Sequence, residues 1–445
     1  MTEKVTWLKR DLGTLELLAL GYSDVSSTYY FTLGIVALNS GPLLPITMLL
    51  GSLSLWLVGL AYTEFGSAIP RTGGAYYYIR RELGNTWGGF ITGWLLSFDQ
   101  ILMIAYGALG TVNYLSIIIP TASRWPMNSV LSILIIVMIM IINILGGVKA
   151  SARFNLTLLI IDLLGIMTLL VLGYYMVISH GVIMPRLPFN YNYLTHGLTY
   201  SLRGGYTGID VIAQSTGEAV SPSLSIPRAI IGVSALSTVV ALLLSLLTTL
   251  SGALTIVSTN VGDPIGALAE YLLHNIYLSI YISASIAIVL LISVNAGIVD
   301  FSRSIYAMSE DGLLPRRLSS VNGRYRTPHL AIITSSLTAM LFTAPGSVQL
   351  IADSYAIAST IVYLMTMIAL IAFRNKETHL VRYFRTPGIT VRQMKVPVVS
   401  IIGIIVYVLS IVLIVLIKSI YVLVVLTWLL IGLLIYLVNK SSQHT

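Results

Sequence analysis

Asp24 is a charged residue in the middle of the first long apolar segment of this chain, within Gly21–Tyr30. A carboxylate at that depth in a membrane costs about 2.5–3.5 kcal/mol on insertion scales. The neighbouring Ser23, Ser26 and Ser27 are poor helix formers whose hydroxyls can satisfy a loosened backbone. These residues predict a broken helix whose acid binds a cation in transit. The alternative is a serine-solvated acid with a structural role only.

Among the other aspartates inside apolar segments, Asp99, Asp162 and Asp210 are candidates for function, and each has more than one interpretation. Asp99 can bind a cation, or it can pair with Arg203 as a buried structural bridge. Asp210 follows a glycine-rich stretch and is a candidate ligand for a cation or a proton; otherwise it is an acid at a helix N-terminus, stabilised by the helix dipole. Asp162 can relay a proton by alternating between charged and neutral forms, and a carboxylate there leaves sodium binding open. Otherwise Asp162 is a buried packing acid.

The composition places these acids in an integral membrane protein. Of the 445 residues, 56% are hydrophobic and 9% are charged, whereas soluble domains carry about 25% charged residues. Since about 20 residues span a bilayer core, the apolar runs predict an all-α protein with twelve transmembrane helices. Their approximate limits are 14–38, 43–68, 88–119, 128–146, 155–178, 198–219, 229–257, 277–307, 329–345, 348–373, 396–417 and 420–438.

The net charge of +8 follows from membrane topology. With both termini in the cytoplasm, 21 of the 25 basic residues fall on the cytoplasmic side. The exceptions are Arg124, Arg186, Arg203 and Lys418. Positively charged loops face the cytoplasm, so this arrangement predicts a multi-pass protein of the plasma membrane with cytoplasmic termini. The basic balance therefore gives no reason to expect a nucleic-acid partner.

Several chemistries are absent from the sequence. There is no cysteine, which excludes disulfides, thiolate metal sites and cysteine nucleophiles. There is also no His-Glu-x-x-His, Gly-x-Ser-x-Gly or P-loop motif, so neither an intramembrane enzyme nor an ATP-driven pump is expected. We expect no cofactor, no bound metal and no obligate protein partner; the partners are a small solute and the lipid bilayer.

The first and the sixth apolar segments carry glycine and serine in their middle. In the sixth, Gly204, Gly205 and Gly208 disfavour a continuous helix. Breaks at matching places in two halves predict a five-plus-five inverted repeat with the substrate bound near the midplane. The alternative for these glycines is close helix packing, which is common in membranes.

Four motifs identify a family by their form and their order along the chain. They are similar to the loop between helices 2 and 3, the entry to helix 5, the break in helix 6 and the loop after helix 8 of the amino acid–polyamine–organocation (APC) superfamily: Ile69–Tyr76, Asn143–Arg153, Tyr206–Asp210 and Ser302–Pro315. The resemblance implies the LeuT-type fold and secondary active transport. It assigns residues 1–395 to a transport core of ten helices and residues 396–445 to two further helices and a short tail.

A second resemblance concerns the acid in the first helix. Amino-acid carriers of the superfamily usually have an uncharged break there, whereas Asp24 is similar to an acid of KUP-type potassium importers. That resemblance also covers Asp99, Asp210 and Tyr355, and it departs at Phe31, where those importers tend to have tyrosine. The motif in the sixth helix, aspartate included, looks like that of cationic amino-acid carriers.

These observations predict a secondary active transporter with alternating access, coupled to protons or alternatively to sodium. The expected solute is an amino acid or polyamine, above all a cationic one; a potassium ion or a neutral amino acid is the alternative. The expected sites are a binding site, a coupling acid at Asp162 and gates at Arg203 and Glu218. The residues of the binding site are Asp24, Ser26, Ser27, Tyr29, Asp99, Thr207, Gly208, Asp210 and Tyr355.

Overall fold

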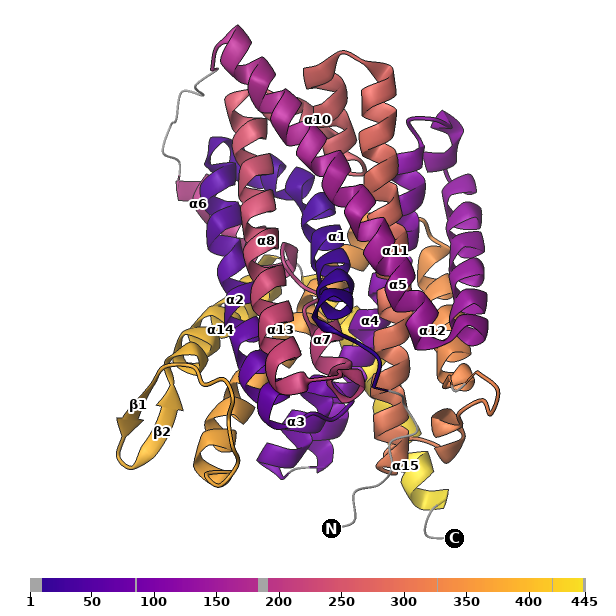
Figure 1. Cartoon of the computed structure of the whole chain (residues 1–445), viewed down its shortest axis with the longest axis vertical. Coiled ribbons are helices and arrows are strands. Elements are labelled where there is room, and N and C mark those ends of the chain that lie inside the picture. Colours follow the sequence, from indigo (N-terminus) through magenta and orange to yellow (C-terminus); the bar gives the residue numbers. More distant parts are fainter. Residues whose placement is uncertain (1–9, 85, 183–190, 326, 418, 443–445) are drawn as a thin grey trace.

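The computed structural model describes residues 10–84, 86–182, 191–325, 327–417 and 419–442, and this part of the chain is a helical bundle (Figure 1). The all-α class predicted from the sequence is confirmed, with one small β-hairpin added. The elements are α1 Thr14–Ser40, η1 Gly41–Leu43, α2 Leu44–Ala68, α3 Gly74–Leu83, α4 Thr86–Leu115, η2 Pro120–Ser123, α5 Met127–His180, α6 Tyr191–Gly204, α7 Asp210–Gln214, η3 Thr216–Glu218, α8 Pro222–Leu250, α9 Leu254–Thr259, α10 Pro264–Leu273, α11 Ile276–Glu310, η4 Arg316–Ser319, α12 His329–Thr343, α13 Val348–Lys376, β1 Gly388–Val391, β2 Met394–Pro397, α14 Val398–Ile417 and α15 Ser419–Ser442.

Nine helical stretches of the described residues are long and apolar enough to cross a membrane. One of them, Thr14–Ala68, contains both α1 and α2, and α5 contains two, Met127–Leu145 and Leu156–His180. The connection expected between the fourth and fifth segments is itself helical, because it has no proline and includes good helix formers. Twelve crossings, the inverted repeat and the division at residue 395 stay predictions.

The predicted break in the first helix is wrong. α1 is helical throughout, and Ser23 and Ser27 donate hydrogen bonds to the carbonyl oxygens three residues earlier, at 2.9 and 2.6 Å. Such local bonds satisfy the hydroxyls without opening the backbone. Gly21 serves close packing, since a Cβ there would lie 2.5 Å from Ile212. The serine and glycine residues of α1 therefore allow a continuous helix to pack closely against neighbouring helices.

The predicted break in the sixth helix is confirmed. α6 ends at Gly204 and α7 begins at Asp210, and the chain between them is not helical. α1 packs against α6, α7 and α11, and α4 packs against α11 and α13. The break is therefore enclosed by helices that are distant in the sequence.

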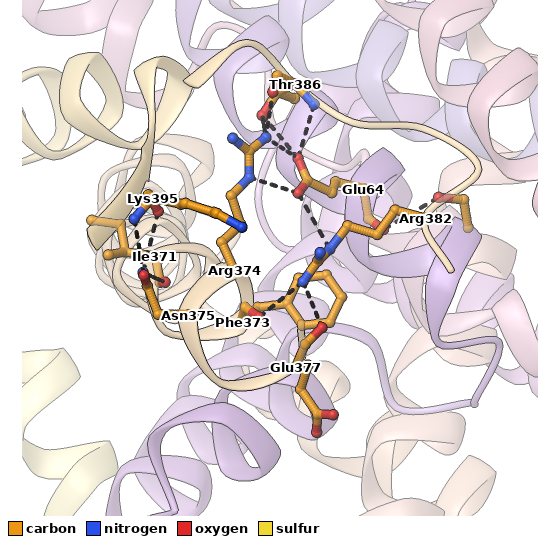
Figure 2. A network of polar contacts seen from close by, with 10 residues as sticks. Glu64, Ile371, Phe373, Arg374, Asn375, Glu377, Arg382, Thr386 and Lys395 are labelled. Carbon is orange, nitrogen blue, oxygen red and sulfur yellow. Dashed lines mark hydrogen bonds and ion pairs between the residues drawn. The ribbon is translucent and has the colours of Figure 1, made fainter. Parts of the chain in front are cut away.

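A buried ion pair fixes the end of α13 to α2 (Figure 2). The Arg374 guanidinium donates to both carboxylate oxygens of Glu64, from Nε at 2.8 Å and from Nη2 at 2.6 Å. Thr386 adds its N–H and its hydroxyl to the same carboxylate, each at 2.9 Å. Both charged side chains are at most 1% exposed. The pair is fully hydrogen-bonded, which a buried ion pair requires for stability.

Replacing one partner tests whether the Glu64–Arg374 ion pair stabilises the fold. Arg374→Ala leaves Glu64 as an unpaired buried charge, which costs about 3–5 kcal/mol in comparable cases. We expect a large drop in the thermal midpoint of the detergent-solubilised protein, measured by size-exclusion chromatography after heating. Arg317→Ala, which removes an exposed arginine, is the control and should leave the midpoint unchanged. Equal midpoints for the two variants would contradict a stabilising role.

Candidate functional site

The break between α6 and α7 lies directly against the carboxylate of Asp24. A Cβ on Gly208 would lie 2.7 Å from the carboxyl carbon of Asp24, and Gly208 has φ of +107°, which L side chains rarely adopt. Thr28 of α1 also approaches the break, with its hydroxyl 3.4 Å from the carbonyl oxygen of Thr207. Because Gly208 has no side chain, the backbone between α6 and α7 can contact the carboxylate of Asp24 in α1.

Asp24 is buried without a hydrogen-bond partner. Its side chain is 1% exposed, and neither carboxylate oxygen has a donor among the described residues. Buried polar groups are nearly always hydrogen-bonded, so an orphaned carboxylate in a native structure needs an explanation. A bound cation or a proton supplies one.

Asp99 and Asp210 are also buried, but they have donors. Ser359 of α13 donates to Asp99. Tyr62 of α2 and Tyr363 of α13 donate to the two oxygens of Asp210, at 2.5 and 2.7 Å. Asp99 and Asp210 both interact electrostatically with Asp24. The structure therefore brings the three aspartates predicted for the binding site together.

Sequence reasoning missed a fourth member of this cluster. Asp300 of α11 is fully buried, and neither of its oxygens has a hydrogen-bond donor among the described residues. It interacts electrostatically with Asp24, Asp99 and Asp210, and also with the guanidinium of Arg303 on the same helix. The signal was an acid within the apolar run Ile298–Phe301, the same signal that singled out Asp24.

The predicted hydroxyl ligands divide into two groups. Thr207 and Tyr355 are nearly buried, and in the described part of the chain their hydroxyls have no hydrogen-bond partner. Ser26 and Ser27 donate to carbonyl oxygens of α1, at 3.3 and 2.6 Å, so their hydrogens are already used. Tyr29 donates to another tyrosine and belongs to a separate cluster.

Glu218, one of the two predicted gate residues, has a buried partner. Arg303 of α11 donates from Nε to a carboxylate oxygen of Glu218 at 2.9 Å, and both side chains are at most 3% exposed. The N–H groups of Asp11 and Leu12 bind the carbonyl oxygen of Glu218, each at 3.0 Å. The ion pair therefore joins η3, α11 and the start of the chain. The side chain of Arg203, the other predicted gate, lies outside the described residues.

Comparison with known proteins assigns the chain to a family. The sequence matches the amino acid permease family over residues 12–438. The chain belongs to this family. It is 25% identical to the branched-chain amino acid permease BcaP of Bacillus subtilis, over 98% of this chain and 94% of that protein. It is 26% identical to the methylthioribose transporter of the same species, over 88% of this chain and 86% of that protein.

A further relative is named for cationic solutes. Cationic amino acid transporter 4 of Mus musculus is 26% identical, over 87% of this chain and 64% of that protein. These relatives are named permeases or transporters, so the chain is not an enzyme. The expected membership of the APC superfamily is confirmed at the level of the amino acid permeases, while the resemblance to KUP-type potassium importers gains no support.

A second polar cluster of the permease contains the predicted coupling acid. Tyr30 of α1 donates to Asp162 of α5 at 2.9 Å. Tyr29 donates to the hydroxyl of Tyr22 at 3.0 Å, and Tyr22 lies 3.4 Å from the hydroxyl of Tyr30. The hydroxyls thus form a continuous buried row that ends at a carboxylate. Such a row can carry a proton between α1 and α5.

Buried acids outnumber buried bases in the described part of the permease. The two buried bases, Arg303 and Arg374, are each paired with a glutamate. Five buried aspartates form no ion pair with a described base: Asp24, Asp99, Asp162, Asp210 and Asp300. An unpaired charge in a low-dielectric interior is expensive. The interior is therefore suited to protons or to a cationic ligand.

Gly208→Ala tests the contact between the break and α1. The new methyl group meets the Asp24 carboxylate and demands a strained backbone, which costs about 1–3 kcal/mol. We expect a lower thermal midpoint for Gly208→Ala in detergent. Gly323→Ala should leave the midpoint unchanged, since no atom lies within 4 Å of the new Cβ.

A double variant identifies the clashing group. If the Asp24 carboxylate causes part of the loss, Asp24→Ala combined with Gly208→Ala recovers stability relative to the sum of the single effects. If the losses of stability caused by Asp24→Ala and Gly208→Ala simply add in the double variant, the contact between the two residues is contradicted.

Proposed function

We propose that this permease is a secondary active transporter that moves a small cationic solute into the cell across the plasma membrane. The solute is a cationic amino acid or a polyamine, and its uptake is coupled to protons. The proposal includes twelve crossings, a five-plus-five inverted repeat of LeuT type and cytoplasmic termini. Alternating access would rock the two repeats around a site at the α6–α7 break.

The excess of buried aspartates supports a cationic solute. Asp24 and Asp300 have no hydrogen-bond donors among the described residues, so an ammonium or guanidinium group would satisfy them directly. Asp99 and Asp210 already accept hydrogen bonds from hydroxyls, and they would add negative potential around the bound charge. No described buried base is free of an acidic partner, so an anionic solute would lack a counter-charge.

The hydroxyls of Thr207 and Tyr355 supply the neutral part of the site. Neither hydroxyl has a hydrogen-bond partner among the described residues, and Tyr355 interacts electrostatically with Asp24, Asp99 and Asp210. A hydroxyl can both donate and accept, so the pair can bind the carboxylate of an amino acid or the second amine of a polyamine. The relative named for cationic amino acids fits this composition.

Proton coupling rests on the row of hydroxyls that ends at Asp162. A proton that reaches Asp162 would neutralise it and weaken its need for the hydrogen bond from Tyr30. Since Tyr30 belongs to α1, which also carries Asp24, the protonation of α5 and the position of the substrate acid would be linked. The alternative is that uptake is coupled to sodium, and the accumulation assay with Asp162→Asn distinguishes the two ions.

Uptake into proteoliposomes tests the substrate class. The assay measures counterflow of radiolabelled arginine, lysine, putrescine, agmatine and leucine. We expect saturable counterflow of at least one cationic solute and a weaker signal for leucine. Asp24→Asn removes a charge-assisted interaction and should weaken transport about 10- to 100-fold. Counterflow of leucine alone, unaffected by Asp24→Asn, would contradict the proposal.

A matched control separates charge from folding. Asp263→Asn makes the same chemical change at the N-terminus of α10, where Asp263 accepts a hydrogen bond from the N–H of Gly266 at 2.8 Å. Asparagine is an equally good N-cap, so this variant should transport like the unmodified protein. All proteins must elute as single monodisperse species before comparison.

Asp162→Asn tests the coupling step separately from binding. Counterflow needs no driving ion gradient, so we expect the variant to retain counterflow. Accumulation driven by an acidic exterior should be lost, because the relay no longer changes charge. Accumulation that persists in the variant and still collapses with a protonophore would contradict the role of Asp162. Accumulation driven by sodium without a pH gradient would assign the coupling to sodium.

A further inference from the structure

The β-hairpin between α13 and α14 has an uncovered apolar face. β1 and β2 pair antiparallel, and the partners Ile389–Val396 and Val391–Met394 share one side of the two-stranded sheet. Ile389, Val391 and Met394 are 49%, 47% and 51% exposed. Exposed apolar side chains gathered on one face mark an interaction surface.

The same hairpin carries uncompensated positive charge. Arg385, Arg392 and Lys395 are exposed and form no ion pair within the described residues. Residues 377–397 contain a single acid, Glu377, and its carboxylate is bound by Arg81 of α3 at 2.9 Å. The hairpin is therefore apolar on one face, whereas Lys395 pairs with Thr390 on the opposite face and Arg392 lies in the turn.

The turn places one of these basic residues at the tip. Arg392 and Gln393 have φ of +46° and +74°. Two-residue turns of this conformation usually contain asparagine and glycine, which adopt positive φ at lower cost. A basic side chain at such a position is locally unfavourable, which points to a use for it at the surface.

The base of the hairpin is anchored rigidly. Lys395 donates its N–H to the side chain of Asn375 at 2.9 Å, and the Asn375 amide donates to the Lys395 carbonyl at 3.2 Å (Figure 2). Thr386, two residues before β1, is hydrogen-bonded to both Glu64 and Arg374. The hairpin tip therefore projects from a fixed platform at the end of α13.

The hairpin extends outward beside α14, at the end of the molecule where α3 lies (Figure 1). α14 begins at Val398, directly after β2, and is one of the apolar stretches that can cross the membrane. Ile402, Ile405 and Val408 of α14 are exposed apolar side chains. The hairpin thus lies directly before an apolar helix that is long enough to cross a membrane.

We propose that this hairpin binds the anionic headgroups of the cytoplasmic leaflet. Its apolar face would enter the boundary between headgroups and acyl chains. Arg385, Arg392 and Lys395 would contact the lipid phosphates, since basic clusters next to a membrane helix attract anionic lipids. The charge of the surface and its continuity with α14 favour lipid over a soluble protein partner.

A single fluorescent label tests this proposal. The chain has no cysteine, so Gln393→Cys creates one labelling site at the hairpin tip for an environment-sensitive nitrobenzoxadiazole dye. The labelled full-length protein is placed in nanodiscs of phosphatidylcholine alone or mixed with phosphatidylglycerol. Emission wavelength and quenching by headgroup-attached nitroxide are measured. We expect a blue shift and stronger quenching in the anionic nanodiscs, both reversed by high salt.

Two triple variants on the labelled background separate the hairpin from general charge. Arg385→Gln/Arg392→Gln/Lys395→Gln should abolish the difference between the two membranes, since each basic side chain raises the membrane-bound population about fivefold. Arg316→Gln/Arg317→Gln/Arg324→Gln removes the same charge elsewhere and should keep the difference. Identical emission in the two membranes would overturn the proposal. The proposal would also be overturned if both triple variants lost the difference in emission between the two membranes to the same extent.

Discussion

The stability of this permease's interior depends on how its buried carboxylates find hydrogen-bond donors or cations, because few buried basic side chains are present in the described part of the chain. Five buried aspartates form no ion pair with a base in the described part of the chain. Hydroxyls bind three of them: Ser359 binds Asp99, Tyr62 and Tyr363 bind Asp210, and Tyr30 binds Asp162. Asp24 and Asp300 have no such donor. These two acids are the points at which a cation would gain most from entering.

The two buried bases are placed at ion pairs that hold helices together. Arg374 joins the end of α13 to α2, and Arg303 joins α11 to Glu218 behind the helix break. Removing one partner of a buried pair costs far more than the intact pair contributes. The Glu64–Arg374 pair is therefore suited to a fixed scaffold. The Glu218–Arg303 pair likewise holds η3 to α11 next to the break.

Hydropathy was sufficient to predict an all-α protein with many membrane-crossing helices, because it depends on composition over long windows. The break at Gly204–Gly208 followed from helix propensity. The break proposed in α1 was wrong because a serine can satisfy its hydroxyl on its own helix, and propensity alone does not distinguish the two outcomes. The role of glycine at position 208 is a tertiary effect, since it depends on where the Asp24 carboxylate lies.

Three of the four acids at the candidate site, Asp24, Asp99 and Asp210, could be listed from the sequence, but their hydrogen-bond partners could not. Asp300 was overlooked beside a strong family motif, although its apolar context was visible. The β-hairpin was not predicted, because its strands are only four residues each and its turn lacks asparagine and glycine. Short strands with unusual turns carry little local signal.

The most direct test of the account is whether the site selects for positive charge. Arginine and citrulline have nearly the same shape, but only arginine carries a guanidinium. Each would compete against a labelled cationic solute for binding to the purified protein in detergent, with and without Asp300→Asn. We expect arginine to compete and citrulline to compete at least tenfold more weakly. Asp300→Asn should reduce this difference in affinity between arginine and citrulline. Equal competition by arginine and citrulline would contradict it.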